Sequence, residues 1–204
     1  MEILNALRTA THAVHTRIET LPVCQAMLAG EVDRDAYTAL LGKLYYLHDR
    51  FESELAACPA VAAVWPLTPS RAQAIARDLA VLGAEPGECP YWIEEWVNEL
   101  NAQENPAVWA GVGYVFEGSR MGSRVLVRTV SKALGLEMKL GNGLDYHLDA
   151  GTDPAGNWRN VMGALVALDR NEDARHAIVT AAVSTFEAMY DLHENATVME
   201  MVEA

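Results

Sequence analysis

Residues 111–122 read GVGYVFEGSRMG and are the most informative segment of this chain. It lies inside a helix that we expect from Pro106 to about Leu134, although it holds four glycines in twelve residues. Each glycine weakens a helix interior by about 1 kcal/mol relative to alanine, and a total of roughly 4 kcal/mol is a large part of a domain's net stability. Two compensating reasons are open. A neighbouring helix can pack closely against small residues, or a backbone bent at Gly118-Ser119 can approach the face of a flat ligand.

The rest of the chain also predicts helices, whose ends follow from cap residues and prolines. Gly135 and the glycines up to Gly151 indicate an irregular connection, and no alternating strand pattern is found. The sequence therefore predicts an all-α, single-domain multi-helix bundle. The expected helices are residues 3–20, ended before Pro22; a helix capped by Asp33; a helix from near Ser70 to Gly83; Tyr91–Leu100; Pro106–Leu134; Trp158–Leu168; and Asp173–Glu194, capped by Asn171.

The bulk composition limits the class of protein. The 204 residues, 51% of them hydrophobic, are enough for one sizeable core, and no apolar run is long enough to predict a transmembrane helix. The first residues show no signal-peptide pattern. Three scattered cysteines without CxxC spacing predict reduced thiols in a cytoplasmic protein. A formal net charge of -13 argues against nucleic acid and anionic membranes as partners.

His15 lies on the apolar side of the first expected helix, with Thr11 and Glu19 one turn away on either side. A lone histidine in such a place is typical of a hydrogen-bonded core residue. Thr11 and Glu19 can also orient the imidazole and favour a neutral tautomer that coordinates iron. An imidazole on one helix and bare backbone on another are what a flat, metal-centred ligand needs when it is held from both faces. Together the two elements predict a haem site, while each alone leaves its structural interpretation open.

These segments, taken with the residues around them, resemble the haem oxygenase family, in particular its bacterial biliverdin-forming members. The similarity spans about residues 4–193 and includes residues 30–37 and 44–52. The matching segments are Leu7-Arg8-x-x-Thr11-x-x-x-His15-x-x-x-Glu19, which is similar to the family's proximal-ligand segment, and Gly111-x-x-Tyr114-Val115-x-Glu117-Gly118-Ser119-x-x-Gly122, which is similar to its haem-covering helix. Trp158-Arg159 and Thr185-Phe186 also match.

The resemblance implies one haem-oxygenase-like helical domain over residues 1–204, with an ordered core at about 3–195. It implies an oxidoreductase that cleaves haem to biliverdin, CO and ferrous iron, using O2 and electrons from an external donor such as ferredoxin or a reductase. Haem would be both substrate and cofactor, with His15 as the axial iron ligand. Gly118, Ser119 and Gly122 would be the catalytic residues on the opposite, distal face, where a backbone without a histidine or arginine offers no acid to split an O–O bond.

The resemblance also suggests which further residues bind haem, and it shows where this chain departs from the family. Ser119 stands where animal members carry an aspartate. Further departures are Tyr146, His147, Ala150 and Gly163, and the last of these stands near the place of a basic residue expected to pair a haem propionate. The other expected haem-binding residues are Arg8, Thr11, Glu19, Tyr114, Arg128 and Arg159.

A row of cations at four-residue spacing runs along the expected helix Pro106–Leu134, namely Arg120, Arg124, Arg128 and Lys132. It can be a solvated helix face that balances acidic neighbours, or a dock for propionates or a redox partner. His48, Asp49 and Glu52 can bind a metal, although such a cluster is more typical of a polar helix face.

Three other functions remain as alternatives. A haem carrier or sensor of the same fold would share His15 and the glycine-rich helix but would not turn over. A di-iron oxidase would need repeated ExxH pairs on facing helices, which the sequence lacks. A thiamine-degrading helical enzyme would need a reactive cysteine, and Cys24, Cys58 and Cys89 have no obvious activating neighbour.

Overall fold

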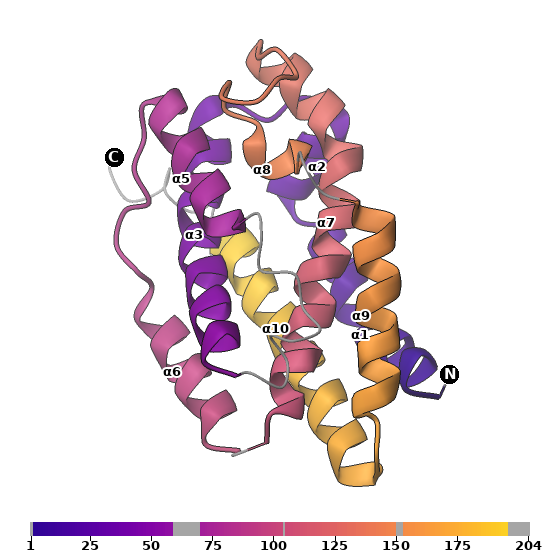
Figure 1. Cartoon of the computed structure of the whole chain (residues 1–204). Coiled ribbons are helices and arrows are strands. Elements are labelled where there is room, and N and C mark those ends of the chain that lie inside the picture. Colours follow the sequence, from indigo (N-terminus) through magenta and orange to yellow (C-terminus); the bar gives the residue numbers. More distant parts are fainter. Residues whose placement is uncertain (1, 59–69, 104, 150–152, 196–204) are drawn as a thin grey trace.

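A computed structural model describes residues 2–58, 70–103, 105–149 and 153–195, and every regular element in these ranges is a helix (Figure 1). The prediction of an all-α fold is therefore confirmed. The expectations for Ala150, Gly151 and the residues beyond 195 lie outside the described ranges. The helices are α1 (Glu2–Glu19), α2 (Pro22–Ala29), α3 (Arg34–Ala57), α5 (Arg71–Leu82), α6 (Tyr91–Asn101), α7 (Ala107–Leu134), α8 (Asp145–Leu148), α9 (Pro154–Leu168) and α10 (Glu172–Asn195).

The predicted cap residues act as caps. The Asp33 carboxylate accepts a hydrogen bond from the Ala36 amide at 2.7 Å, and the Asn171 side chain accepts one from the Ala174 amide at 2.8 Å. Gly83 ends α5 with a φ of 75°, a left-handed conformation in which a side chain would be strained. Local sequence therefore determines most helix ends in this chain.

Two helices and one helix start differ from the prediction. The chain breaks at Leu21 but begins α2 at once, because a proline such as Pro22 is well tolerated at the first helical position, where no amide donor is needed. The single turn α8 lies inside the connection that we expected to be irregular. α9 begins at Pro154 rather than Trp158, with the Asp153 carboxylate accepting from the Gly156 amide at 3.0 Å.

α7 is the central helix of the bundle, and α10, α9, α8 and α2 pack along it (Figure 1). α1 packs mainly on α10, and α5 packs on α3. At the crossing of α7 with α10, a Cβ atom added to Gly111 would overlap the Ile178 carbonyl oxygen and press on Ala181 at 3.1 Å. Close helix packing is therefore the reason for glycine at this position.

No helix in the described ranges is both long enough and apolar enough to span a lipid bilayer.

Candidate functional site

A cavity of about 420 Å³ opens between the helices, with a volume typical of small-molecule sites. Most of its lining is apolar. Side chains from α1, α2, α3, α7, α8, α9 and α10 contribute to it, so that segments from both ends of the sequence meet at one site. Six of the residues predicted from the sequence line this cavity, namely His15, Glu19, Tyr114, Gly118, Ser119 and Gly122.

His15 stands at the edge of the cavity on α1, with 54% of its side chain exposed. It therefore faces an opening and is not the core residue of the structural alternative. Its Nδ1 lies 3.6 Å from Glu19 Oε1, and the edge of its ring meets Phe186 of α10 at 5.5 Å between centroids. The carboxylate orients the imidazole through Nδ1, which leaves Nε2 for a metal.

Thr11 does not take part in orienting His15. Its hydroxyl is buried and donates to the Leu7 carbonyl at 2.8 Å, one turn back along α1. A hydrogen bond with Thr11 also lowers the pKa of Tyr114, but burial has the larger effect and raises that pKa. Thr11 thus supports the Tyr114 side chain from outside the cavity lining, while Glu19 and Phe186 contact the imidazole.

The distal wall is the part of α7 that carries Gly118 and Gly122. A Cβ atom added at Gly122 would meet nothing within 4 Å, and one added at Gly118 would make ordinary contact with the Trp158 ring at 3.8 Å. Main chain therefore borders open space at Gly122 and an aromatic side chain at Gly118, and neither position is crowded as Gly111 is. The Ser119 hydroxyl donates to the Phe116 carbonyl at 2.7 Å.

None of the three predicted arginines lines the cavity. Arg8, Arg128 and Arg159 are all exposed, and no lysine or arginine occurs in the lining formed by the described residues. Arg8 approaches closely enough to lower the pKa of Tyr114, an effect smaller than that of burial. The structure therefore does not bring these three cations into the site.

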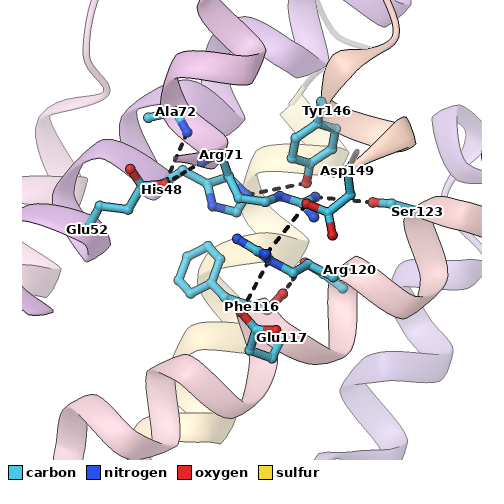
Figure 2. A network of polar contacts seen from close by, with 11 residues as sticks. His48, Glu52, Arg71, Ala72, Phe116, Glu117, Arg120, Ser123, Tyr146 and Asp149 are labelled. Carbon is cyan, nitrogen blue, oxygen red and sulfur yellow. Dashed lines mark hydrogen bonds and ion pairs between the residues drawn. The ribbon is translucent and has the colours of Figure 1, made fainter. Parts of the chain in front are cut away.

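Between α7 and the helices α3, α5 and α8 lies a network of buried charged and polar groups (Figure 2). Arg120 Nε lies 3.2 Å from Glu117 Oε1, and Arg120 Nη1 lies 3.5 Å from Asp149 Oδ1. The cationic row on α7 is therefore interrupted, because Arg120 is only 4% exposed. Arg124, Arg128 and Lys132 remain on the surface.

Arg71 joins this network to the cavity wall. Its Nη2 donates to the Ser123 hydroxyl at 3.3 Å, and its guanidinium lies 4.0 Å from the centre of the Tyr146 ring (Figure 2). Both Ser123 and Tyr146 line the cavity. The network thus contacts the cavity wall through the buried guanidinium of Arg71, which supports Ser123 and Tyr146.

The interpretation of His48, Asp49 and Glu52 as a polar helix face is wrong for two of the three residues. His48 is 1% exposed, and its Nε2 lies 3.3 Å from the Tyr146 hydroxyl. Glu52 is half-buried and accepts hydrogen bonds at the start of α5, at 2.7 Å from the amide of Arg71. Among the described residues, no group of three or more metal-ligating side chains is suitably placed for a metal ion.

Sequence reasoning missed His147 and His193 as lining residues, although Tyr146-His147 had been noted as a departure. His147 is 3% exposed and stacks on Tyr37 at 5.7 Å between ring centroids. Burial lowers the pKa of His147 to about 3, so its imidazole is neutral at physiological pH. Burial also lowers the pKa of His193, whose Nδ1 contacts the Met189 carbonyl at 2.6 Å.

α8 is held in place by Asp78 of α5. The Asp78 carboxylate accepts hydrogen bonds from the amides of Asp145 at 2.7 Å and Tyr146 at 2.8 Å. Burial raises the pKa of Asp78 to about 6, because the charged form is poorly solvated. A residue 67 positions earlier in the chain thus fixes the turn that carries His147.

The cysteines do not supply a nucleophile to the cavity. Cys24 is the cysteine that lines it, and burial raises the pKa of its thiol to about 12. A thiol with so high a pKa is not a thiolate at neutral pH.

The fold and the cavity define a helical protein with a largely apolar site, bordered by the imidazole of His15 on α1 and by glycine main chain on α7. The donor set fits haem. The apolar lining suits a porphyrin, His15 Nε2 suits its iron, and the open space beside Gly122 is what a closely approaching macrocycle requires.

Comparison with known proteins gives the same result. A family model described as "Heme oxygenase" matches residues 1–195. A haem oxygenase from Xanthomonas campestris pv. campestris is 30% identical over 164 residues, which cover 79% of this chain and 91% of the relative.

Solved structures are similar over nearly the whole chain. Haem oxygenase from Leptospira interrogans has a TM-score of 0.82 at 21% identity and covers 96% of this chain and 100% of its own. Haem oxygenase-1 of Synechocystis sp. PCC 6803, solved in complex with haem, has a TM-score of 0.81 at 19% identity, with 96% and 92% covered. A TenA homologue from Pseudomonas syringae pv. tomato reaches a TM-score of 0.65 at 12% identity, with 95% and 92% covered, so the fold alone does not define the family.

The chain belongs to the haem oxygenase family. It is an oxidoreductase that uses O2 to cleave haem to biliverdin, CO and ferrous iron, and haem is both its substrate and its iron-bearing cofactor. The predictions of the family, the activity and the cofactor are confirmed.

Proposed function

We propose that haem lies in the cavity with His15 Nε2 on its iron and the Gly118–Gly122 part of α7 across its opposite face. The observation that carries this proposal is the pairing of an oriented, half-exposed imidazole with main chain that borders open space in the same cavity. When bound, haem supplies the iron that activates O2 and the porphyrin that is oxidised.

The surrounding side chains have distinct roles in this proposal. Glu19 lies 3.6 Å from His15 Nδ1, and its carboxylate favours the orientation in which Nδ1 faces Glu19 and Nε2 is left for the iron. Phe186 packs against His15, and Trp158 packs against Tyr114 at 5.7 Å between ring centroids. These aromatic groups and the apolar lining exclude water and fix the macrocycle laterally. The backbone at Gly118 and Gly122 would restrict the space beside a bound macrocycle, and this restriction would decide which part of the porphyrin is accessible to oxidation.

The electrons come from an external donor, such as ferredoxin or a reductase. A chain with a net charge of -13 repels an acidic donor over most of its surface. The exposed cations Arg124, Arg128 and Lys132 on α7 are the surface that suits an acidic donor, and they lie on the helix that also borders the cavity. The three cysteines are free thiols, which supports the reducing cytoplasm as the place of function.

A hemin titration tests the axial ligand. The wild-type protein is expected to give a Soret band and a histidine-ligated ferric spectrum, and His15→Ala is expected to lose that spectrum. His12→Ala is the matched control, because His12 is an exposed histidine on the same helix and does not line the cavity. An unchanged spectrum in His15→Ala would show that the ligand assignment is wrong.

Turnover separates the enzyme from the haem carrier or sensor. With a reductant under air, the Soret band of the wild-type complex is expected to decay to the broad red absorption of biliverdin, with release of CO. A Soret band that persists under these conditions would favour the carrier. Family membership supports the enzyme.

A further inference from the structure

One part of the cavity wall carries buried polar atoms that make no hydrogen bond within the protein. The hydroxyl of Tyr37 and both ring nitrogens of His147 are buried and make no hydrogen bond. Both residues line the cavity, and their rings are stacked with an interplanar angle of 21°. Buried polar groups in native proteins are nearly always hydrogen-bonded to protein or to ordered water. These unpaired atoms therefore favour the binding of a small polar ligand at this part of the cavity.

Packing does not explain a histidine at this position. A phenylalanine would stack on Tyr37 as well and would leave no nitrogen unpaired in the interior. The Ser123 backbone interacts with the His147 ring and raises its pKa against the larger effect of burial, although the two make no hydrogen bond of normal geometry. At most one of the two nitrogens can be satisfied there by a small shift. The other nitrogen remains for a group inside the cavity.

The position of His147 specifies which face of a bound macrocycle it serves. Ser123 belongs to α7 and follows Gly122 directly, so the ring stands beside the distal wall. His193, the other buried histidine of the lining, comes from α10, the helix whose Phe186 contacts the His15 ring. His147 therefore comes from the turn beside α7, whereas His193 comes from the helix that packs against His15.

We propose that His147, assisted by the Tyr37 hydroxyl, is a positioning residue that hydrogen-bonds the small oxygen ligand, water or dioxygen, on the face of the haem opposite His15. This inference rests on the haem placement proposed above. A neutral imidazole offers one N–H and one lone pair, so it can hold either ligand without acting as an acid. The polar group that bare glycine backbone cannot supply thus comes from α8. Asp78 positions it, because its carboxylate binds the first amides of that helix.

The test compares ferric haem complexes by electronic absorption and resonance Raman spectroscopy, which distinguish iron with a water ligand from five-coordinate iron. The wild type is expected to be mainly six-coordinate. In His147→Phe, which keeps the stacking on Tyr37 but removes both nitrogens, the six-coordinate fraction is expected to fall by more than half. His147→Gln restores a donor and an acceptor and is expected to recover most of the water ligand. The control His193→Phe removes a lining histidine that comes from α10 and whose Nδ1 already contacts the Met189 carbonyl, and it is expected to leave coordination unchanged.

Each outcome decides the matter. An unchanged six-coordinate fraction in His147→Phe overturns the proposal, as does an equal loss in His193→Phe. Thermal unfolding of the apo-proteins detects a variant that is merely misfolded. Should His147→Phe not fold, Tyr37→Phe takes its place, with a smaller loss of water expected and no loss counting against the proposal. If the wild type forms no histidine-ligated complex that depends on His15, the haem placement itself is wrong and this inference falls with it.

Discussion

The two ends of α7 use glycine for different physical reasons. At the Gly111 end the backbone of α10 lies so close that an added Cβ would overlap the Ile178 carbonyl oxygen. At the Gly122 end an added Cβ would meet nothing within 4 Å, because the helix borders the cavity there. The glycine-rich sequence thus combines a packing contact and a cavity-lining surface in one helix. Both positions carry glycine, so the residue type does not distinguish the two roles. The space beside each glycine does.

The largest expected effect is at the packing end. Gly111→Ala is expected to lower the free energy of unfolding of the apo-protein by about 3 kcal/mol, because α7 and α10 must move apart to make room for the methyl group. The loss should exceed the gain of about 1 kcal/mol in helix propensity. Urea unfolding measures it. Gly122→Ala is the control and should be neutral or slightly stabilising. Equal destabilisation by both substitutions would contradict a division of α7 into two functional ends.

The next effect is at the cavity end and is on activity. Gly122→Leu is expected to leave the apo-protein folded but to slow biliverdin formation at least tenfold, about 1.4 kcal/mol in activation free energy, or to change the bilin isomer. The leucine side chain extends into the space that we assign to the distal face. Single-turnover absorption and chromatography of the bilin products measure both outcomes. Wild-type rate and isomer in this variant would place the haem elsewhere.

The elements that sequence predicted are those with local causes. Asp33, Ser70 and Asn171 cap helices through their own side chains, and His15 with Glu19 forms one turn of one helix. These contacts follow from spacing alone. For that reason the sequence alone could place His15, Glu19, Gly118 and Gly122 on the two helices that bring them to the cavity.

The features that sequence missed depend on contacts between distant segments. α8 is a single turn whose first amides donate to the Asp78 carboxylate of α5. No local sequence pattern predicts a partner so far away in the chain. Arg120 has the spacing of a surface row, yet it is buried and forms ion pairs with Glu117 and Asp149. His147 lines the cavity because of the way several helices pack together, which the local sequence does not indicate. The position of α8 and the burial of Arg120 thus depend on tertiary charge and hydrogen-bond contacts, which helical periodicity does not predict.

A smaller effect concerns pH and again separates the two ends, since only the cavity end lies beside His147. The pKa of His147 is lowered from 6.5 to about 3 in the folded chain. Its contribution to stability is therefore full above pH 6.5 and is lost as the pH falls towards 3, because the unfolded chain takes up the proton first. Between pH 7.5 and 5.5 this loss is about 1 kcal/mol.

Urea unfolding of the wild type and His147→Phe at these two pH values measures that share. The variant is expected to lose about 1 kcal/mol less than the wild type. Asp78 acts in the opposite direction: its raised pKa of about 6 makes its contribution full below pH 3.8 and lost as the pH rises through 6. It is present in both proteins and cancels in the comparison. Identical pH dependence in the two proteins would mean that His147 is not held neutral by burial.

The smallest expected effect distinguishes backbone from side chain at the cavity end itself. The Ser119 hydroxyl already donates to the Phe116 carbonyl at 2.7 Å, one turn back along α7. Ser119→Ala is therefore expected to change kcat for biliverdin formation by less than about threefold, or roughly 0.6 kcal/mol. A loss of tenfold or more would mean that the hydroxyl turns away from the helix and acts on the ligand. In that case the distal face would work through a side chain of α7 as well as through its main chain, and the polar role that we assign to His147 would be shared.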